Sequence, residues 1–384
     1  MLYKMDLIDP SFVEGADIPP TGKRPRVAKF FALAACLCIV AAGVFAVLKF
    51  TSSPLPTPDL EKLTISESEP GGFGFEGYMY YDDSELENDN PWDEKTEITK
   101  LPVYRNGAYD PSGAGLPLGL DEEQMRSLLD SAASALGVEV ISTETETEND
   151  KNGAPVTVEL RAQTSNGSIY VMADGGVVYF LPGGGLALPE KYDFTLTNEK
   201  TDEAHEIISY LANIYGGLLG FEKSTPASWG EYNTNGDFYR RYSVYDSHGT
   251  LTEKILNYNL RTASFFPSDD GKLDAIRINN RLITAEKIGD YPIISAEEAK
   301  RLLLAGNYQT SVPYAMPGKE YVAKTELIYR AGRGDQMLMP YYRFYVLLPD
   351  TEREGGLKTY GAYYVPAVKG EYIVNMPVYD GRFN

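Results

Sequence analysis

The longest apolar stretch of the chain runs from Phe30 to Leu48 and contains no charged residue and no proline. A helix rises about 1.5 Å per residue, so this stretch can cross a hydrocarbon core about 30 Å thick. Lys29 and Lys49 stand at its two ends, where their amines can reach the membrane interfaces. A core helix of this length would usually keep a polar face. We therefore predict a transmembrane helix within residues 29–50.

The charges beside this stretch predict its orientation. Lys23, Arg24, Arg26 and Lys29 precede it, which places residues 1–28 in the cytosol as a short tail. A cleaved signal peptide and a lipoprotein are the alternatives. Four acidic residues in the tail weigh against a signal peptide. The second alternative rests on a lipobox ending at Cys36, but the apolar stretch continues well beyond that cysteine.

Three later segments carry apolar residues at helical spacing. They are Asp121 to Leu136, Asp202 to Tyr215 and a segment that begins at Ser295 and stops near Gly306. Asp121 with Gln124, and Ser295 with Glu298, match the capping-box pattern. Gly137 and Gly216-Gly217 are the expected stops of the first two. The expected inward residues are Met125, Leu128, Leu129, Ala132, Ala133 and Leu136, then Ile207, Ile208, Leu211 and Ile214, then Ala299, Leu302 and Leu303.

Short segments of strand character follow each predicted helix. They are Gly137–Thr147, Val156–Thr164, Ser168–Met172 and Gly176–Phe180, then Ser224–Tyr232, Phe238–Asp246, Ile255–Asn259, Ala263–Pro267 and Leu273–Asn279, then Val322–Tyr329, Tyr341–Leu348 and Tyr360–Val368. The turns Asn152-Gly153, Asn166-Gly167 and Asp174-Gly175 favour tight hairpins. Strands that follow a helix in runs predict antiparallel sheets with helices on one face, which is an α+β fold.

This pattern suggests a division of the chain into domains. Residues 51–102 are rich in Pro, Ser, Gly and acids and are expected to form a stalk, although Phe73–Tyr81 is aromatic enough to pack onto the domain that follows. Three loosely repeated α-β-β-β modules would then occupy residues 103–200, 201–290 and 291–384.

The charge balance narrows the choice of partners. The chain has 35 basic and 55 acidic residues, and residues 30–384 carry a net charge of −21. A surface this acidic repels phosphate backbones, so nucleic acid is not an expected partner, whereas cations and cationic peptides are. Both cysteines, Cys36 and Cys38, lie in the apolar stretch, which leaves no disulfide outside it. A large cysteine-free outer domain favours a bacterial protein.

The sequence offers little catalytic or metal-binding chemistry. Its two histidines are His205, on the expected solvated face of the second helix, and His248, in a turn. Neither has a second histidine at zinc-ligand spacing, and no Gly-x-Ser-x-Gly motif accompanies them. A Ser-His-Asp triad stays possible by count alone. We assign no catalytic, cofactor-binding or metal-binding residue.

One segment imitates a calcium loop. Glu148, Asp150 and Asn152, with Glu159 in the twelfth position, follow the spacing of an EF-hand loop. The first position is not aspartate, Pro155 falls within the loop, and the flanks alternate like strands. A hairpin turn is the favoured interpretation. Weak calcium binding here or at the acidic clusters Tyr81–Glu87 and Ser268–Gly271 remains a minor alternative.

Tyrosine-rich segments are more distinctive. Tyr341–Tyr345 and Tyr360–Val365 could present a sugar- or peptide-binding face, or they could simply be strands with rings in the core. The second interpretation is favoured, because sugar-binding platforms tend to use tryptophan, and the chain has two, Trp92 and Trp229.

Part of the chain resembles a known module. Ile294–Lys300, followed by Tyr321–Tyr329 and Pro340–Val346, looks like a PepSY-type module, in which Ser-x-Glu-Glu-Ala opens a helix and a strand ends in Pro-x-Tyr-x-Phe-x-Val. The whole chain also resembles a group of single-pass membrane-anchored proteins of gut Firmicutes that has no established activity. The residues that carry this second resemblance are Asp9–Glu14, Phe75–Tyr80, Asn90–Trp92, Tyr363–Val368 and Met376–Gly381.

The resemblance implies a function in the cell envelope. Proteins with a short tail, one helix and PepSY-like outer domains resemble accessory regulators of envelope sensor kinases, and anti-sigma factors share the layout. We therefore expect a non-enzymatic regulatory or sensory protein, anchored through residues 30–48, that binds a protein or peptide partner. A surface module that binds wall or host glycans is the alternative, and a hydrolase that uses unassigned carboxylates is a third.

Overall fold

The computed structural model describes residues 60–66, 79–80, 82–112, 115–150, 152–233, 236–349 and 357–381. The predicted tail (1–28) and transmembrane helix (29–50) lie outside the described residues. Within the described ranges, no helix is long and apolar enough to cross a membrane. All of these residues belong to one unit that begins at Leu60. Its fold is α+β, with antiparallel sheets and few helices.

The three predicted helices form close to their expected bounds. Helix α2 is Glu122–Leu136, α3 is Thr201–Ile214 and α6 is Ala296–Leu304. Asp121 and Gln124 form the expected capping box, and Gly137 ends α2 in the left-handed conformation. Helix α3 ends before Gly216-Gly217 as expected, but these glycines do not cap it and instead open a further helical turn, α4 (Gly216–Leu219). Ile214 is also exposed rather than inward.

Helix α5 (Leu251–Leu260) corrects the strand expected at Ile255–Asn259. The Thr250 side chain accepts a hydrogen bond from the Glu253 N–H, and the Glu253 side chain in return accepts from the Thr250 N–H. This capping box satisfies two backbone donors at the start of the helix. Ile255, Leu256 and Leu260 then form a buried stripe at helical spacing. Over so few residues, the apolar pattern alone does not distinguish a helix from a strand.

This cap allows a first test. Replacing Thr250 with alanine should lower the free energy of unfolding by about 1 kcal/mol, because the side-chain acceptor at the helix start is lost. Thr252→Ala, a change of the same chemistry inside α5, should cost less. Urea unfolding of the two variants, followed by circular dichroism, measures the difference, and equal losses would contradict the capping role.

Most strands belong to one antiparallel sheet of nine strands. Its order is β3-β4-β5-β6-β11-β10-β9-β8, with β7 also paired to β11. The strands are β3 (Val140–Asn149), β4 (Pro155–Thr164), β5 (Ser168–Met172), β6 (Val177–Phe180), β7 (Leu186–Ala187), β8 (Ser224–Tyr232), β9 (Phe238–Asp246), β10 (Arg261–Pro267) and β11 (Lys272–Asn280). The β6–β11 pairing joins strands from the expected modules 103–200 and 201–290 in one sheet.

Two smaller antiparallel sheets complete the unit. One has the order β1-β17-β16-β14, with β13 paired to β17, and the other has the order β12-β2-β15. Their strands are β1 (Met79–Tyr80), β2 (Lys100–Arg105), β12 (Glu286–Pro292), β13 (Gln309–Thr310), β14 (Val322–Tyr329), β15 (Met337–Leu338), β16 (Pro340–Leu347) and β17 (Tyr360–Pro366).

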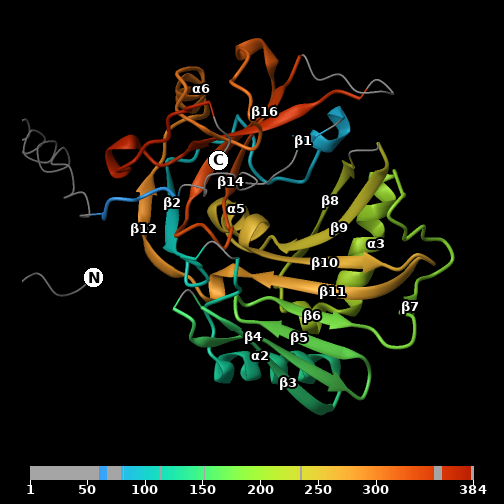
Figure 1. Ribbon diagram of the computed structural model, residues 1–384. Helices are drawn as coiled ribbons and strands as arrows, with labels where there is room; N and C mark the ends of the chain where they lie inside the picture. The colour runs from blue at the N-terminus through green and yellow to red at the C-terminus, as the bar shows by residue number, and fades with distance from the viewer. Residues whose placement is uncertain are drawn as a thin grey trace, which may run out of the picture. The chain divides into compact units, whose positions relative to one another are not determined.

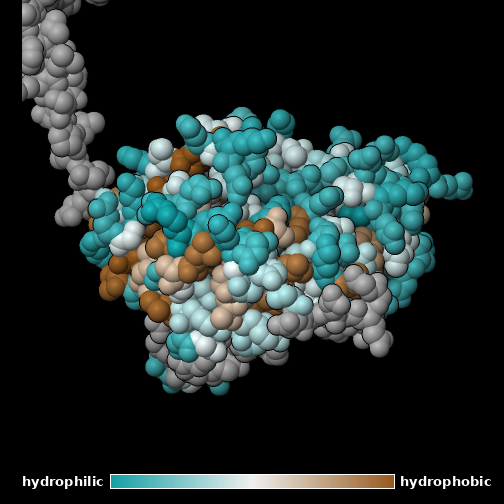
Figure 2. All heavy atoms as spheres, turned by 90° about the horizontal axis from the view of Figure 1, so that it is seen from above, coloured by the Kyte–Doolittle hydropathy of each residue, from teal (hydrophilic) through white to brown (hydrophobic). Residues whose placement is uncertain are grey.

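The helices connect the sheets to their hydrophobic cores. Helices α2 and α3 share one core with the nine-stranded sheet, to which Met125 and Ile208 contribute. Helices α5 and α6 bury apolar residues in a second core with β14, β16 and β17. Figure 1 shows α2 and α3 along the nine-stranded sheet and α6 beside the smaller sheets. Viewed from above, the surface is mostly hydrophilic, with hydrophobic residues in separate patches, in line with the acidic composition (Figure 2).

The described parts of the expected stalk, residues 60–66, 79–80 and 82–102, are built into the folded unit. Leu63 and Trp92 are buried, and Leu63 forms a parallel bridge with Ile373. The indole of Trp92 packs edge-on against Tyr342, with ring centroids 5.6 Å apart. Apolar residues spaced along an otherwise polar segment are sufficient to hold it on a core, which a composition average does not reveal.

Candidate binding grooves

A polar segment, residues 82–90, crosses between the two larger sheets, and we call it the strap. On one side, the Glu85 carboxylate accepts from the Tyr232 N–H at 2.7 Å, and the Asp89 carboxylate accepts from the Ser228 N–H at 2.9 Å. Both donors are backbone groups of β8, the last strand of its sheet. The strap carboxylates therefore satisfy groups at a sheet edge that would otherwise need another partner.

The other side of the strap is bound to β14. The Asn88 side-chain amide donates to the Glu326 carboxylate at 2.5 Å, and the Asn90 amide donates to the Leu327 carbonyl at 3.3 Å. The Lys324 ammonium group also donates a hydrogen bond to the Leu86 carbonyl. The strap thus bridges β8 and β14 through polar contacts to both.

A groove of about 400 Å³ lies between the strap, the start of α3 and the β8–β9 hairpin. We call it the strap groove. Its charged wall residues are Glu87, Asp89, Glu199 and Arg240, and its aromatic wall residues are Tyr232 and Phe238. Three carboxylates and one guanidinium give its walls an acidic excess. An acidic wall with half-buried rings suits a cationic ligand that also carries apolar groups.

Arg240 is the buried basic group of this groove, with 5% of its surface exposed. Its guanidinium donates to the carbonyls of Asn198, at 2.8 Å, and Glu199, at 2.7 Å, and lies over the Phe238 ring. Burial lowers the pKa of this guanidinium from its usual value. Arg240 therefore fixes the loop before α3 and forms part of the rigid wall.

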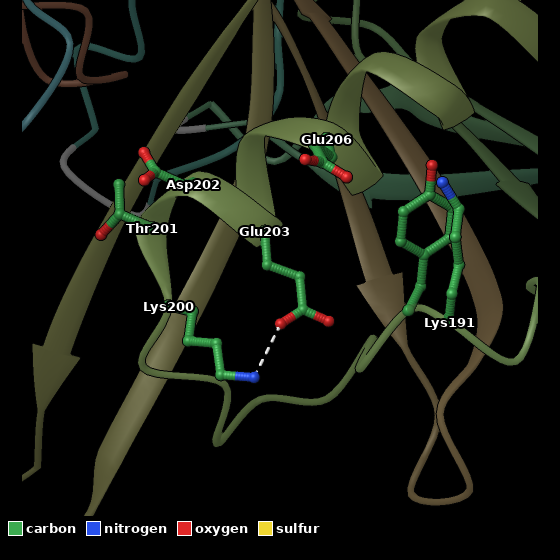
Figure 3. A pocket seen from close by; sticks show the side chains of 7 residues that line it. Lys191, Lys200, Thr201, Asp202, Glu203 and Glu206 are labelled. Carbon is green, nitrogen blue, oxygen red and sulfur yellow. Dashed lines mark hydrogen bonds and ion pairs between the residues drawn. The ribbon is translucent and has the colours of Figure 1, made fainter.

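A second, wider hollow of about 620 Å³ lies at the start of α3, and Thr201 borders both hollows. Figure 3 shows its side chains, with Lys200 turned toward Glu203; the two groups are 3.1 Å apart. The Asp193 N–H donates to Glu203 and lowers the pKa of that carboxyl. Two lysines and three carboxylates line this hollow, so the charges of its walls nearly balance.

His205 lies beside the strap groove, but the groups around it are not arranged as a catalytic triad. Its Nε2 is 2.9 Å from the Asp89 carboxylate, and 31% of its side chain is exposed, so it is not on a fully solvated face as expected. Ser228 reaches the same carboxylate through its backbone N–H, while its hydroxyl donates to the Arg241 carbonyl. In a triad the imidazole stands between the serine hydroxyl and the carboxylate. Here the carboxylate stands between the other two residues.

The remaining sites weighed from the sequence lie in turns at the surface. His248 is exposed, with its Nε2 3.3 Å from Glu222. The segment that imitates a calcium loop is a hairpin turn between β3 and β4, in which Asp150 accepts from the N–H groups of Asn152 and Ala154. Ser268 donates to Asp270 in the β10–β11 turn. Among the described residues, no group of three or more Asp, Glu, His or Cys side chains could hold a metal ion.

The tyrosine-rich segments form β16 and β17 and lie in the core, which confirms the structural interpretation. The residues concerned, each at most 2% exposed, are Tyr341, Tyr342, Tyr345, Tyr360, Tyr363 and Tyr364. Trp92 is buried as well, while Trp229 is half-buried and donates its indole N–H to Glu231. The rings in β16 and β17 therefore serve packing rather than ligand binding.

The sequence did not reveal three buried carboxylates. Glu326 contacts Arg343 and Lys324, each at 2.6 Å. Asp174 lies 2.6 Å from both Arg281 and Arg333, and Asp246 accepts from three backbone N–H groups. Arg343 interrupts the otherwise apolar strand β16, and this was the available signal, although it does not identify the partner. Glu326 follows Lys324 and Thr325 in β14, so its own strand gave no such signal. The sequence does not distinguish Asp89 from its neighbours, because it lies in a run of acidic residues.

No family model matches the chain, and a search of curated proteins finds no match either.

Proposed function

We propose that the protein is a non-enzymatic, membrane-anchored regulator whose outer unit binds a basic segment of a protein or peptide in the strap groove. Residues 30–48 would span the cell membrane, and residues 1–28 would lie in the cytosol. The finer organisation into α-β-β-β modules, with a PepSY-like module at 291–384, is part of the same proposal.

The observation that carries this proposal is the composition of the strap groove. Its walls combine Glu87, Asp89 and Glu199 with the rings of Tyr232 and Phe238. Carboxylates attract lysine and arginine side chains over several ångströms, and aromatic faces add contact area and cation–π attraction. The walls come from three separated segments of the chain, so a ligand in the groove would contact the strap and the nine-stranded sheet together.

Two experiments separate this regulator from a simple surface-binding module. In the first, residues 1–50 are replaced by an unrelated single-pass anchor in cells that express the full chain. A regulator should keep its cross-linked partners but lose its effect on the transcript profile, because the outer unit is intact and the inner tail is gone. If the effect on transcripts survives the exchange, residues 1–50 serve only as an anchor, and the proposed inward signalling through the tail and helix is wrong.

The second experiment tests the groove itself. The double variant Glu87→Lys/Glu199→Lys should reduce recovery of the cross-linked partner about tenfold, since it reverses the sign of two wall charges. Asp130→Lys/Asp269→Lys is the matched control, because it changes the net charge equally at two exposed positions elsewhere. Equal recovery from both variants would remove the groove from the proposal. Turnover of a wall-derived substrate that disappears in either variant would favour the hydrolase instead.

A further inference from the structure

Strand β3 is unusual because none of its residues is buried. All ten positions from Val140 to Asn149 are exposed, and Ile141 reaches 71%. A strand in a sheet normally buries alternate side chains on at least one face. The side chains of β3 therefore add little to the core, and its pairing with β4 holds it in place.

The outer edge of β3 is open in the described part of the chain. Strand β3 ends the nine-stranded sheet and pairs with β4 on one side (Figure 1). At the opposite end of the sheet, the strap carboxylates of Glu85 and Asp89 occupy backbone donors of β8. One edge of the sheet is thus covered, and the other presents backbone N–H and C=O groups to solvent. An edge of this kind can receive another strand.

The side chains of β3 give this edge a definite charge. Successive residues point to opposite faces, so Glu144, Glu146 and Glu148 share one face, and threonines occupy the other. Glu146 is paired with Arg161 of β4 at 2.7 Å. Among the described residues, neither Glu144 nor Glu148 forms an ion pair, so both carboxylates are available to a neighbouring strand.

This arrangement selects the kind of strand that can be added. A second copy of β3 would place glutamates beside glutamates, and like charges on neighbouring strands destabilise the pairing. A strand with lysine or arginine at alternate positions would place each cation beside a glutamate. We propose that the β3 edge binds an extended cationic segment of a partner protein as an additional strand, at a site separate from the strap groove.

Two kinds of contact would form in this complex. Main-chain hydrogen bonds along β3 would supply affinity for any extended segment, while Glu144 and Glu148 would select basic side chains on one face. The threonine face would accept β-branched residues such as valine or threonine. The competing interpretation is that the glutamates only prevent self-association, and in that case no peptide forms main-chain bonds with the edge.

The test uses the full-length chain in a neutral detergent and a fluorescent ten-residue peptide of alternating lysine and threonine. Two further peptides carry N-methyl groups on all lysines or on all threonines, which removes the N–H donors along one edge of the peptide and keeps its charge. Fluorescence anisotropy should show that the unmodified peptide binds. One methylated peptide should bind about tenfold more weakly, and the other should keep the affinity of the unmodified peptide. Binding of both methylated peptides with unchanged affinity would overturn the proposal, because charge alone would then explain it.

Substitutions locate the site. Glu144→Lys/Glu148→Lys should weaken the unmodified peptide about tenfold, and Asp130→Lys/Asp269→Lys, with the same change in net charge, should not. If the lysine variant does not fold by circular dichroism, Glu144→Gln/Glu148→Gln replaces it, with the same direction of effect expected. The groove variant Glu87→Lys/Glu199→Lys should bind the peptide normally, so failure at one site is distinguishable from failure at the other. Absence of binding by the unmodified peptide, or equally tight binding of a peptide with the sequence of β3 itself, would also overturn the proposal.

Discussion

Replacing Glu326 with glutamine should lower the free energy of unfolding by about 3–5 kcal/mol. Glu326 is 1% exposed, and its carboxylate contacts Arg343, Lys324 and the Asn88 amide. The neutral amide keeps the shape of the side chain but removes the buried counter-charge that Arg343 and the partly exposed Lys324 share. Urea unfolding of the full chain in a neutral detergent, followed by circular dichroism, measures the loss.

The control for this change is Glu298→Gln. Glu298 forms an exposed ion pair with Arg301 on α6, so its loss should alter stability by at most about 0.5 kcal/mol. A comparable loss of stability in both variants would show that the buried Glu326 cluster contributes no more than an exposed ion pair does.

The stability of the fold at acid pH should also depend on the Glu326 carboxylate. Burial by itself would raise the pKa of Glu326, but the charges of Arg343 and Lys324 outweigh burial and lower the pKa from its ordinary 4.5 to about 2. Because the folded-state pKa is depressed, the stabilisation is fully present above pH 4.5 and is lost as the pH falls toward 2. That difference corresponds to about 3 kcal/mol. Glu326→Gln should therefore flatten the dependence of stability on pH in this range, and an unchanged slope would contradict the assignment.

Replacing Trp92 with alanine should cost about 3–5 kcal/mol, because a large buried ring is removed from the core. Trp92 is 5% exposed and lies in a segment whose composition suggested a stalk. Its loss should also loosen the strap, because the Trp92 ring packs against Tyr342 and holds this segment on the core beside Asn90, which contacts β14. Urea unfolding measures the first effect, and the rate of limited proteolysis within residues 82–102 measures the second.

Trp229→Ala is the matched control for Trp92. The Trp229 ring is half-buried on β8, and its indole N–H bonds to Glu231, so its removal should cost only about 1 kcal/mol. If Trp92→Ala proved no more damaging than Trp229→Ala, residues 82–102 would behave as a stalk after all.

Local patterns predicted much of the fold. Alternation and turn signals placed β5, β8, β9 and β14 at the bounds observed, and the Asp121 cap placed the start of α2. The apolar pattern did not distinguish a helix from a strand over the few residues of α5. It also missed β2 and β12, which belong to a small sheet. The partners of a strand depend on distant segments, so the β6–β11 pairing could not be derived from either strand alone.

The candidate sites were less accessible to sequence reasoning. The strap groove is assembled from residues near 88, 200, 230 and 240, and no spacing rule links them. Acidic residues are so numerous that Asp89, which organises the strap, looks like its neighbours. The tyrosines of β16 and β17 were interpreted correctly, because aromatic residues in strands are most often core residues.

The bridge between Leu63 and Ile373 joins a segment that is synthesised early to one that is synthesised late, which delays part of the folding. Residues 60–66 and the strap leave the ribosome early, yet several of their partners, in β14, β17 and around Ile373, are synthesised late. The meander β3–β6 can assemble locally in the meantime, but the second hydrophobic core cannot close until those late segments arrive. A chain that stalls before β17 would therefore expose the apolar side chains of Leu63 and Trp92, and exposed apolar surface makes an incomplete chain prone to aggregation.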